Sequence, residues 1–383
     1  MTTRGKRFML LSACMIVRNE ERFLEGALLS LKDVADEIVV VDTGSTDRTL
    51  SLCADHGARI CQFPWNGDFS AARNEGLKQA RGRWILSIDA DERLRPCCTS
   101  LARSLSNDTS KIAYYSLLQP KTQWTGMRVL RLFRNDPRLR YQGFIHESIR
   151  QDIERILVSD GLEIGESGLI MDHVGYDGDQ SSKHWRNLPL LLKELERDPQ
   201  NTNNRRHLAL IYAEMGEDDL AEETLRTIIF TLRQRDKLES VDSLPFVDLI
   251  LQRLQRGEEA NGLLDEAMAL FPENPHLFWL QGRVLMDRDC CAEAVPFFER
   301  LIQWGKRNDF DRSISYDTRI FNIHAYDSLA TCFFRLGRYS QSEKYFEIAR
   351  RCAPEQLEYT AKATLCALRK ASLKGTASTS GPS

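Results

Sequence analysis

The N-terminal half of the chain alternates between short apolar runs and stretches of helical spacing. Apolar runs of strand length occupy four segments, residues 10–17, 37–41, 59–62 and 84–88. Between them, apolar residues recur every three or four positions and predict helices over 20–32, 47–56 and 69–80. This alternation predicts a largely parallel sheet with helices on both faces.

The first of these runs needs separate treatment because the stretch RGKRFMLLSACMIV is basic and then apolar, as signal peptides are. No small-residue cleavage site follows it, and the run is far shorter than the roughly 20 residues of a membrane span. A helical pattern begins immediately afterwards. We therefore expect a first buried strand here, and neither a leader nor a membrane span.

From Lys183 to Leu373 the pattern is helical throughout, and three stretches within it can be aligned. Each has a small residue, a turn position, a second small residue and a large apolar one: Ala209, Gly216, Ala221 and Leu225; Gly282, Asp289, Ala294 and Phe298; Ala330, Gly337, Ser342 and Phe346. Such spacing lets two helices pack closely and stack on their neighbours. It resembles the tetratricopeptide repeat over 203–230, 275–304 and 322–355, with a degenerate copy expected at 245–272. The alternative is a generic α-helical bundle.

These patterns predict an α/β domain over residues 8–180 and an all-α, tetratricopeptide-like region over residues 181–372. A Gly/Ser/Thr-rich tail over residues 373–383 is expected to be disordered. A chain of 383 residues is long enough for two domains of about 150 residues each.

Composition excludes some classes of function. The net charge of −3 argues against a nucleic-acid partner, which usually meets a basic face. The ten cysteines form no CxxC motif, and the vicinal pairs Cys97-Cys98 and Cys290-Cys291 suit ordinary disulfides poorly. We expect reduced thiols and a cytoplasmic protein.

Candidate chemistry begins where the strand in GRWILSIDADERL runs into Asp89-Ala90-Asp91. In an extended segment residues i and i+2 point the same way, so both carboxylates would share one side. Such a pair costs Coulomb energy unless a cation joins it. Mg²⁺ or Mn²⁺, which also bridge diphosphate oxygens, would supply that cation. The alternative is an acidic turn that caps the next helix.

Four motifs in order give this pair a context: SACMIVRNEE, VVDTGSTDRT, FSAARNEGLKQARGRWILSIDADE and YQGFIHESI. Together they resemble the family 2 glycosyltransferases, which have the GT-A fold, across roughly residues 8 to 177. The subgroup that carries a C-terminal tetratricopeptide region is most similar. The resemblance implies that the donor nucleotide sugar lies over the carboxyl ends of the first strands, where an open α/β sheet binds ligands.

The resemblance also implies roles for individual residues. The donor would be bound by Asp42 at the nucleotide base, by Arg73 beside the base or diphosphate, and by Val17, Asn19 and Asp89. Asp47, by contrast, is interpreted as a structural acid in the first turn of the next helix.

For the transfer itself, Glu147 matches the family's catalytic carboxylate, and His146 is expected to shape the acceptor pocket. The alternative for Glu147 is an exposed glutamate at a strand start. Asp91 would bind the metal ion, with His173 either as a further ligand or as a structural histidine.

The resemblance therefore implies a metal-dependent, inverting, hexosyltransferase-type enzyme that uses a nucleoside-diphosphate sugar, with a UDP-sugar favoured. A helical-repeat groove suits a protein or peptide acceptor. A lipopolysaccharide or other glycan acceptor is the alternative within the enzyme class. Outside it, the chain would be a non-catalytic repeat adaptor with a nucleotide-binding domain. The repeats would equally serve to form a homo-oligomer.

Overall fold

A computed structural model describes residues 9–96, 105, 108–120, 122–175 and 181–378. It divides into two compact units, Met1–Thr122 with Gly126–Thr224, and Gln123–Thr125 with Leu225–Ser383. The domain boundary expected at residue 180 lies beside residues 176–180, outside the described residues, and the first unit continues past it. Among the described helices, none has the length and apolar character needed to cross a membrane. The described cysteines are free thiols, and Cys97 and Cys98 lie outside the described residues.

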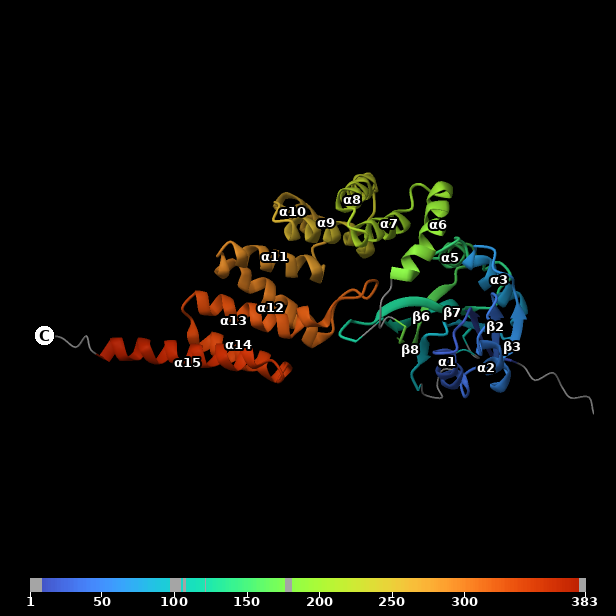
Figure 1. The fold of residues 1–383 in the computed structure, drawn as a ribbon, viewed down its shortest axis with the longest axis horizontal. Coiled ribbons are helices and arrows are strands. Elements are labelled where there is room, and N and C mark those ends of the chain that lie inside the picture. The colour runs from blue at the N-terminus through green and yellow to red at the C-terminus, as the bar shows by residue number, and fades with distance from the viewer. Residues whose placement is uncertain (1–8, 97–104, 106–107, 121, 176–180, 379–383) are drawn as a thin grey trace, which may run out of the picture. The chain divides into compact units, whose positions relative to one another are not determined.

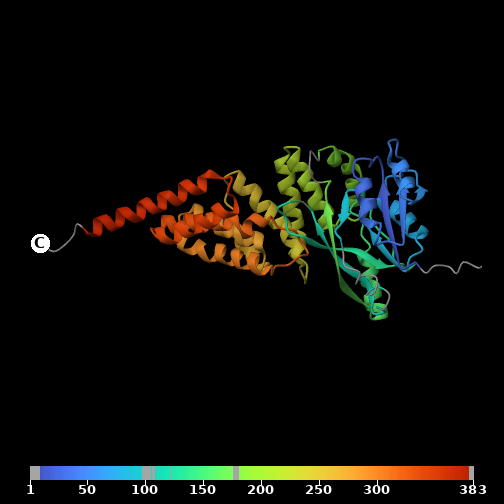
Figure 2. The ribbon, with the colours of Figure 1, turned by 90° about the horizontal axis from the view of Figure 1, so that it is seen from below.

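The first unit is built on an eight-stranded sheet in the order β3-β2-β1-β4-β7-β6-β8-β5 (Figure 1). Its strands are β1 Leu11–Val17, β2 Glu37–Asp42, β3 Arg59–Gln62, β4 Trp84–Ser87, β5 Glu92–Leu94, β6 Lys111–Gln119, β7 Met127–Arg134 and β8 Glu163–His173. Its helices are α1 Leu24–Leu31, α2 Thr49–Asp55, α3 Phe69–Gln79, α5 Arg150–Asp160, α6 Ser181–Arg197 and α7 Thr202–Glu214. In Figure 2 the strands of this sheet run side by side.

In the parallel half, β1 lies between β2 and β4. Alternate residues of β1 face opposite layers, as the period of a strand requires. Ala13 and Met15 belong to the core cluster that includes the apolar residues of α1, whereas Cys14 belongs to the cluster with Leu77 of α3 and Ile153 of α5. The four predicted strands and the predicted coverage of both faces are confirmed.

The second half of the sheet differs from the expectation of a largely parallel arrangement. β7 is antiparallel to both β4 and β6, and β5 is antiparallel to β8. β6 and β7 follow each other along the chain, and a short connection permits only antiparallel pairing. The predicted fold class, an α/β domain followed by a helical region, is nevertheless confirmed.

The helical region consists of successive helices, most of them joined by short connections. Its elements are α8 Asp218–Leu232, α9 Leu244–Gln255, α10 Asn261–Leu270, α11 Pro275–Asp287, α12 Cys291–Arg307, α13 Ile323–Arg335, α14 Tyr339–Cys352 and α15 Leu357–Ser378. The turns of the four expected repeats all contain a residue with positive φ, at Gly216, Gly257, Asp289 and Gly337. Helices α7 to α14 therefore form the four helix–turn–helix units that the spacing predicts, the degenerate copy included.

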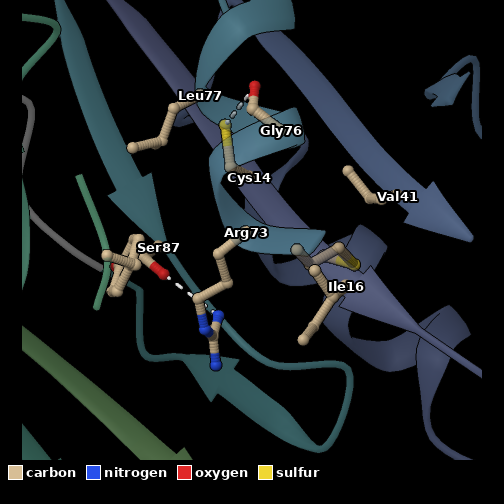
Figure 3. A pocket seen from close by; sticks show the side chains of 9 residues that line it. Cys14, Ile16, Val41, Arg73, Gly76, Leu77 and Ser87 are labelled. Atoms are coloured by element: carbon tan, nitrogen blue, oxygen red, sulfur yellow. Dashed lines mark hydrogen bonds between the residues drawn. The ribbon is translucent and has the colours of Figure 1, made fainter. Parts of the chain in front are cut away.

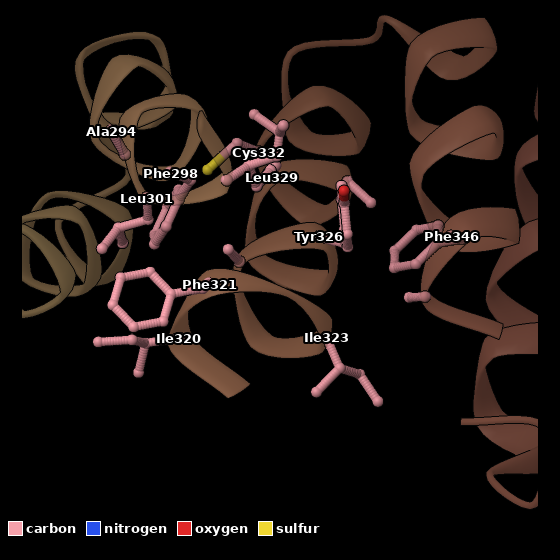
Figure 4. Close-up of a cluster of buried hydrophobic side chains, with 14 of the residues drawn as sticks. Ala294, Phe298, Leu301, Ile320, Phe321, Ile323, Tyr326, Leu329, Cys332 and Phe346 are labelled. Atoms are coloured by element: carbon pink, nitrogen blue, oxygen red, sulfur yellow. The ribbon is translucent and has the colours of Figure 1, made fainter. Parts of the chain in front are cut away.

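Close packing explains the small residues of the repeat. A Cβ atom at Gly282 would lie 2.9 Å from the ring of Phe298, which is fully buried. Figure 4 shows Phe298 and Leu301 of α12 on the side that α13 approaches with Leu329 and Cys332. At the end of the chain, α15 continues to Ser378, so the first residues of the expected disordered tail are helical. Residues 379–383 lie outside the described residues.

Candidate active site

Two loops meet at the carboxyl ends of β1 and β2. Val17 ends β1, and its carbonyl accepts the N–H and the hydroxyl of Thr43, at 3.0 and 3.1 Å. Asn19 has a φ of 55° and accepts the N–H of Thr46 at 2.7 Å. Asp42 is buried and accepts N–H groups from the loop that follows β2. Three of the five residues predicted to bind the donor, Val17, Asn19 and Asp42, therefore lie on one rim whose two loops are joined by hydrogen bonds.

Asp42 and Asp47 differ in position. The carboxylate of Asp42 accepts the N–H of Gly44 at 3.2 Å and of Ser45 at 3.1 Å, which leaves acceptor capacity for a ligand. Asp47 accepts the N–H of Thr49, the first residue of α2, at 2.9 Å. Asp47 therefore lies two residues before α2 and not in its first turn, where the sequence predicted it, and its structural role is to accept an N–H at the helix start.

The segment from Asp89 to Asp91 is a turn and not the extended segment expected. Glu92 donates its N–H to the Asp89 carbonyl at 3.0 Å, and the Glu92 carboxylate accepts the Asp89 N–H at 2.9 Å. The turn arises because β4 ends at Ser87 and the chain reverses into β5, which pairs with β8. The two carboxylates consequently contact different partners: Asp89 binds arginines, and Asp91 lies beside His173.

A network of alternating charges surrounds Asp89. Arg73 of α3 donates to Glu147 and, at 2.8 Å, to Asp89. Arg131 of β7 donates to Asp89 and to the completely buried Glu92, both at 2.8 Å. Arg131 and Glu92 have no role in the sequence analysis. Glu92 follows the DAD motif directly and could have been noticed, whereas no local signal marks Arg131 among the charged residues of β7.

The network shifts the pKa values of its members. Burial disfavours the charged form of Asp89, but Arg131 and Arg73 outweigh burial and hold its pKa well below its usual range. Burial raises the pKa of Glu92 to about 7, and the charge of Arg131 only partly opposes that shift. Burial also opposes the charge on Arg73, but Asp89 and Glu147 overcome it and raise the Arg73 pKa. The network thus favours the ionised form of Asp89, whereas burial makes Glu92 easier to protonate than an exposed carboxyl group.

Asp91 and His173 are the pair predicted to bind a metal ion. Antiparallel pairing of β5 with β8 places Glu92 opposite His173, and the His173 Nε2 atom lies 3.6 Å from the Asp91 Oδ2 atom. One carboxylate and one imidazole suit Mn²⁺. Within the described residues no group of three or more His, Cys, Asp or Glu side chains could hold an ion. The donor set therefore fits a metal ion that takes its remaining ligands from diphosphate oxygens and water.

Glu147 lies at the neck of a closed loop. Gln142 and Ser148 exchange backbone hydrogen bonds of 3.0 and 2.9 Å, which close the loop over residues 142–148. His146 is exposed, has a φ of 51°, and stacks on His207 of α7 at 3.8 Å between ring centroids. Arg73 holds the Glu147 carboxylate, whose side chain is 11% exposed. The loop thus brings Glu147 onto the same arginine as Asp89.

A small cavity lies beneath Arg73. It measures about 10 Å³ and is lined by Arg73, Ser87 and mostly apolar side chains of β1, β2 and α3. Figure 3 shows Arg73 reaching Ser87 across it, while Cys14 points toward the Gly76 carbonyl. A space of this size holds about one water molecule. It is a packing defect below the site and has no room for a nucleotide.

Comparison with known proteins gives a family for the first unit. Residues 12–161 match the family described as Glycosyl transferase family 2. A TPR repeat-containing protein of Synechococcus elongatus is 40% identical over 148 residues, which cover 38% of this chain and 36% of that protein. The SPbeta prophage-derived glycosyltransferase SunS of Bacillus subtilis is 28% identical over 197 residues, covering 49% of this chain and 45% of SunS.

Among solved structures, S. aureus TarS covers 67% of this chain and 54% of its own, with 15% identity and a TM-score of 0.35, too low to support an argument. The chain spans less than half the length of the two curated relatives above. The family match covers β1 to α5 and includes the loop that carries Glu147. This chain therefore carries a domain of the glycosyl transferase family 2, followed by a tetratricopeptide-like helical region.

Proposed function

We propose that this chain is a metal-dependent, inverting glycosyltransferase that moves a hexose from a nucleoside-diphosphate sugar, by preference a UDP-sugar, to a protein or peptide. The observation that carries this proposal is the convergence on Arg73. One guanidinium binds both Asp89, next to the Asp91–His173 pair, and Glu147. The candidate base is thereby held on the same arginine as Asp89, which lies two residues before the candidate metal ligand Asp91.

Each residue of the site has a separate proposed role. Asp42 and Asn19 form the rim that receives the nucleotide, with the Asp42 carboxylate accepting an N–H of the base. Asp91 and His173 hold Mg²⁺ or Mn²⁺, which when bound stabilises the charge that develops on the leaving diphosphate. Glu147 accepts the proton of the attacking hydroxyl or thiol. Arg73 fixes the Glu147 carboxylate through its Oε1 atom, so the Oε2 atom would face the acceptor.

The acceptor is proposed from the second unit. Consecutive helix pairs create extended concave surfaces that suit a polypeptide. A glycan acceptor is the alternative, which acceptor assays decide. A chain that binds a donor but neither hydrolyses nor transfers the sugar would be a nucleotide-binding adaptor, and this enzymatic proposal would then be wrong.

The experiment that tests the proposal combines donor, metal and one pair of variants. UDP-, GDP- and ADP-sugars are titrated into the full chain with Mn²⁺, with Mg²⁺ or with EDTA, and hydrolysis is followed. We expect donor binding and turnover to require the metal ion. Asp91→Ala should abolish turnover because it removes a metal ligand. It should leave the thermal unfolding midpoint nearly unchanged, because the contact of the Asp91 carboxylate with His173 is long, at 3.6 Å.

Asp89→Ala is the matched variant. It removes the shared partner of Arg73 and Arg131, so it should lower both turnover and the unfolding midpoint. Full activity of the wild-type chain in EDTA would contradict the metal-dependent mechanism. Equal loss of stability in Asp89→Ala and Asp91→Ala would contradict the division of roles between the two acids.

A further inference from the structure

Helices α6 and α7 follow the family-matched residues along the chain, but they pack on the loop that carries Glu147. Both belong to the first compact unit. Leu191 of α6 and Leu208 and Ile211 of α7 form one buried cluster with Ile145, which lies two residues before Glu147. The first helices of the repeat region therefore share a core with the candidate catalytic loop.

Phe144 is the residue through which α6 holds this loop. Its N–H donates to the Glu194 Oε2 atom at 2.7 Å, and the Glu194 side chain is only 2% exposed. Arg197 pairs with the other oxygen of Glu194. Lys193 and Arg197 also lie over the Phe144 ring, 3.8 and 5.3 Å from its centroid. The buried carboxylate fixes the backbone at Phe144, because its loss would leave the Phe144 N–H without its acceptor.

The same residue joins α6 to α3. The Phe144 carbonyl accepts the N–H of Phe69, the first residue of α3, at 3.0 Å. Helix α3 carries Arg73, and Arg73 binds Glu147. A continuous series of contacts thus connects Glu194 to Glu147. It passes through Phe144 and then through Arg73 of α3.

The second contact comes from α7 and lies beside Glu147 in sequence. His207 stacks on His146 at an interplanar angle of 15°. His146 has a φ of 51°, in the left-handed region that is unfavourable for a residue with a Cβ atom. Such a conformation persists when its surroundings over-determine it, and the stacked His207 ring is part of those surroundings.

We propose that α6 and α7 belong to the catalytic machinery, with Glu194 and His207 as positioning residues that hold the Glu147 loop in its working conformation. This inference rests on the proposed function, since it assigns a task to the loop that carries the base. It also assigns the first helices of the repeat region to turnover, independently of any part that the later helices have in acceptor docking.

The test uses the full chain and three variants. Glu194→Leu removes the acceptor of the Phe144 N–H, whereas Glu194→Gln retains an amide oxygen for it. Asp242→Leu is the matched control in the second unit, because Asp242 is also buried, accepts the Glu239 N–H at 2.9 Å and pairs with an arginine at 3.1 Å. Donor hydrolysis, thermal unfolding and hydrogen exchange at the Phe144 amide are measured for each.

We expect Glu194→Leu to lower kcat about 10-fold or more with KM for the donor nearly unchanged, since small misplacements of a reacting group cost that much. Glu194→Gln should recover most of kcat. Asp242→Leu should lose comparable thermal stability at wild-type kcat. Exchange at Phe144 should become faster in Glu194→Leu alone. Equal kcat in Glu194→Leu and Asp242→Leu, or unchanged exchange at Phe144, would overturn the inference.

Two further outcomes are a wild-type chain without turnover and a Glu194→Leu variant that does not fold. A wild-type chain without turnover would contradict the proposed function, and exchange at Phe144 would then decide the positioning role. If Glu194→Leu does not fold, His207→Ala and His207→Phe replace it. The alanine variant loses the stack on His146 and should lower kcat, whereas phenylalanine retains an aromatic face and should stay near the wild-type value. Equal kcat in these two variants would overturn the inference.

Discussion

The two halves of the N-terminal sheet hold their acidic side chains in different ways. In the parallel half, Asp42 accepts backbone N–H groups two or three residues further along the chain, and Asp47 accepts those of Thr49 and Glu21. In the antiparallel half and the loops beside it, Asp89, Glu92 and Glu147 depend on arginines that lie up to 74 residues away in sequence. Backbone N–H groups therefore hold Asp42 and Asp47 in the first half, whereas arginine side chains hold the three acids of the second.

This difference has an energetic consequence. A backbone N–H that loses a capping acid can be satisfied by water or by the amide that replaces the acid, at a cost of about 1 kcal/mol. A buried ion pair that loses one partner leaves an uncompensated charge, which costs about 3–5 kcal/mol. We therefore expect replacement of one acid to cost little stability on the nucleotide side of the site and more stability on the transfer side.

The largest effect is expected from Arg131→Met. This change leaves the buried Glu92 without its cationic partner and removes one of the two arginines on Asp89. The free energy of unfolding should fall by about 3–5 kcal/mol, measured by chemical denaturation at pH 8, above the pKa of about 7 that Glu92 has with Arg131 present.

Asp42→Asn is the counterpart in the parallel half. The amide retains an oxygen for the Ser45 N–H, so the free energy of unfolding should fall by about 1 kcal/mol or less. Equal losses in the two variants would break the comparison between a locally capped half and an ion-paired half.

A smaller effect is expected from the proton on Glu92. Burial raises its pKa from 4.5 to about 7, so between these values the folded chain holds a proton that the unfolded chain has released. The contribution of Glu92 to the free energy of unfolding is therefore greatest below pH 4.5 and falls as pH rises to 7. The slope is about 1 kcal/mol per pH unit or less.

Glu92→Gln cannot ionise and should remove this slope. The measurement is chemical denaturation of both proteins from pH 5 to pH 8, compared as a difference so that other titrating groups, such as His146, cancel. A wild-type profile parallel to that of Glu92→Gln across this window would show that Glu92 stays ionised, supported by Arg131.

The same division explains what could be predicted from sequence. Strands β1 to β4, the role of Asp47 and the repeat turns follow from patterns within about ten residues. The helix predicted from residue 20 begins only at Leu24, and the turn before it donates the N–H groups of Glu20 and Glu21 to Thr49 and Asp47. That interaction is between segments, and no local pattern contains it.

The candidate site divides in the same manner. Asp91 and His173 meet as expected, because a late strand returns to the DAD motif. The prediction that the Asp89 and Asp91 carboxylates share one side is wrong, because it assumed an extended backbone where the chain turns. Arg131 and Glu194 escaped notice because their partners come from other elements, 42 and 50 residues away.

The central claim is that Glu147, held by Arg73, takes the proton of the acceptor, and the turnover of Glu147→Gln tests it most directly. The amide retains an oxygen for Arg73, whose charge Asp89 still compensates, so donor affinity should stay close to that of the wild type. Positioned proton transfer contributes about 10²–10⁴-fold, and transfer to an acceptor at saturating donor should fall by that factor. Glu154→Gln, at an exposed glutamate of α5 paired with Arg150, should leave the rate unchanged. Equal transfer rates for Glu147→Gln and the wild type would contradict the account.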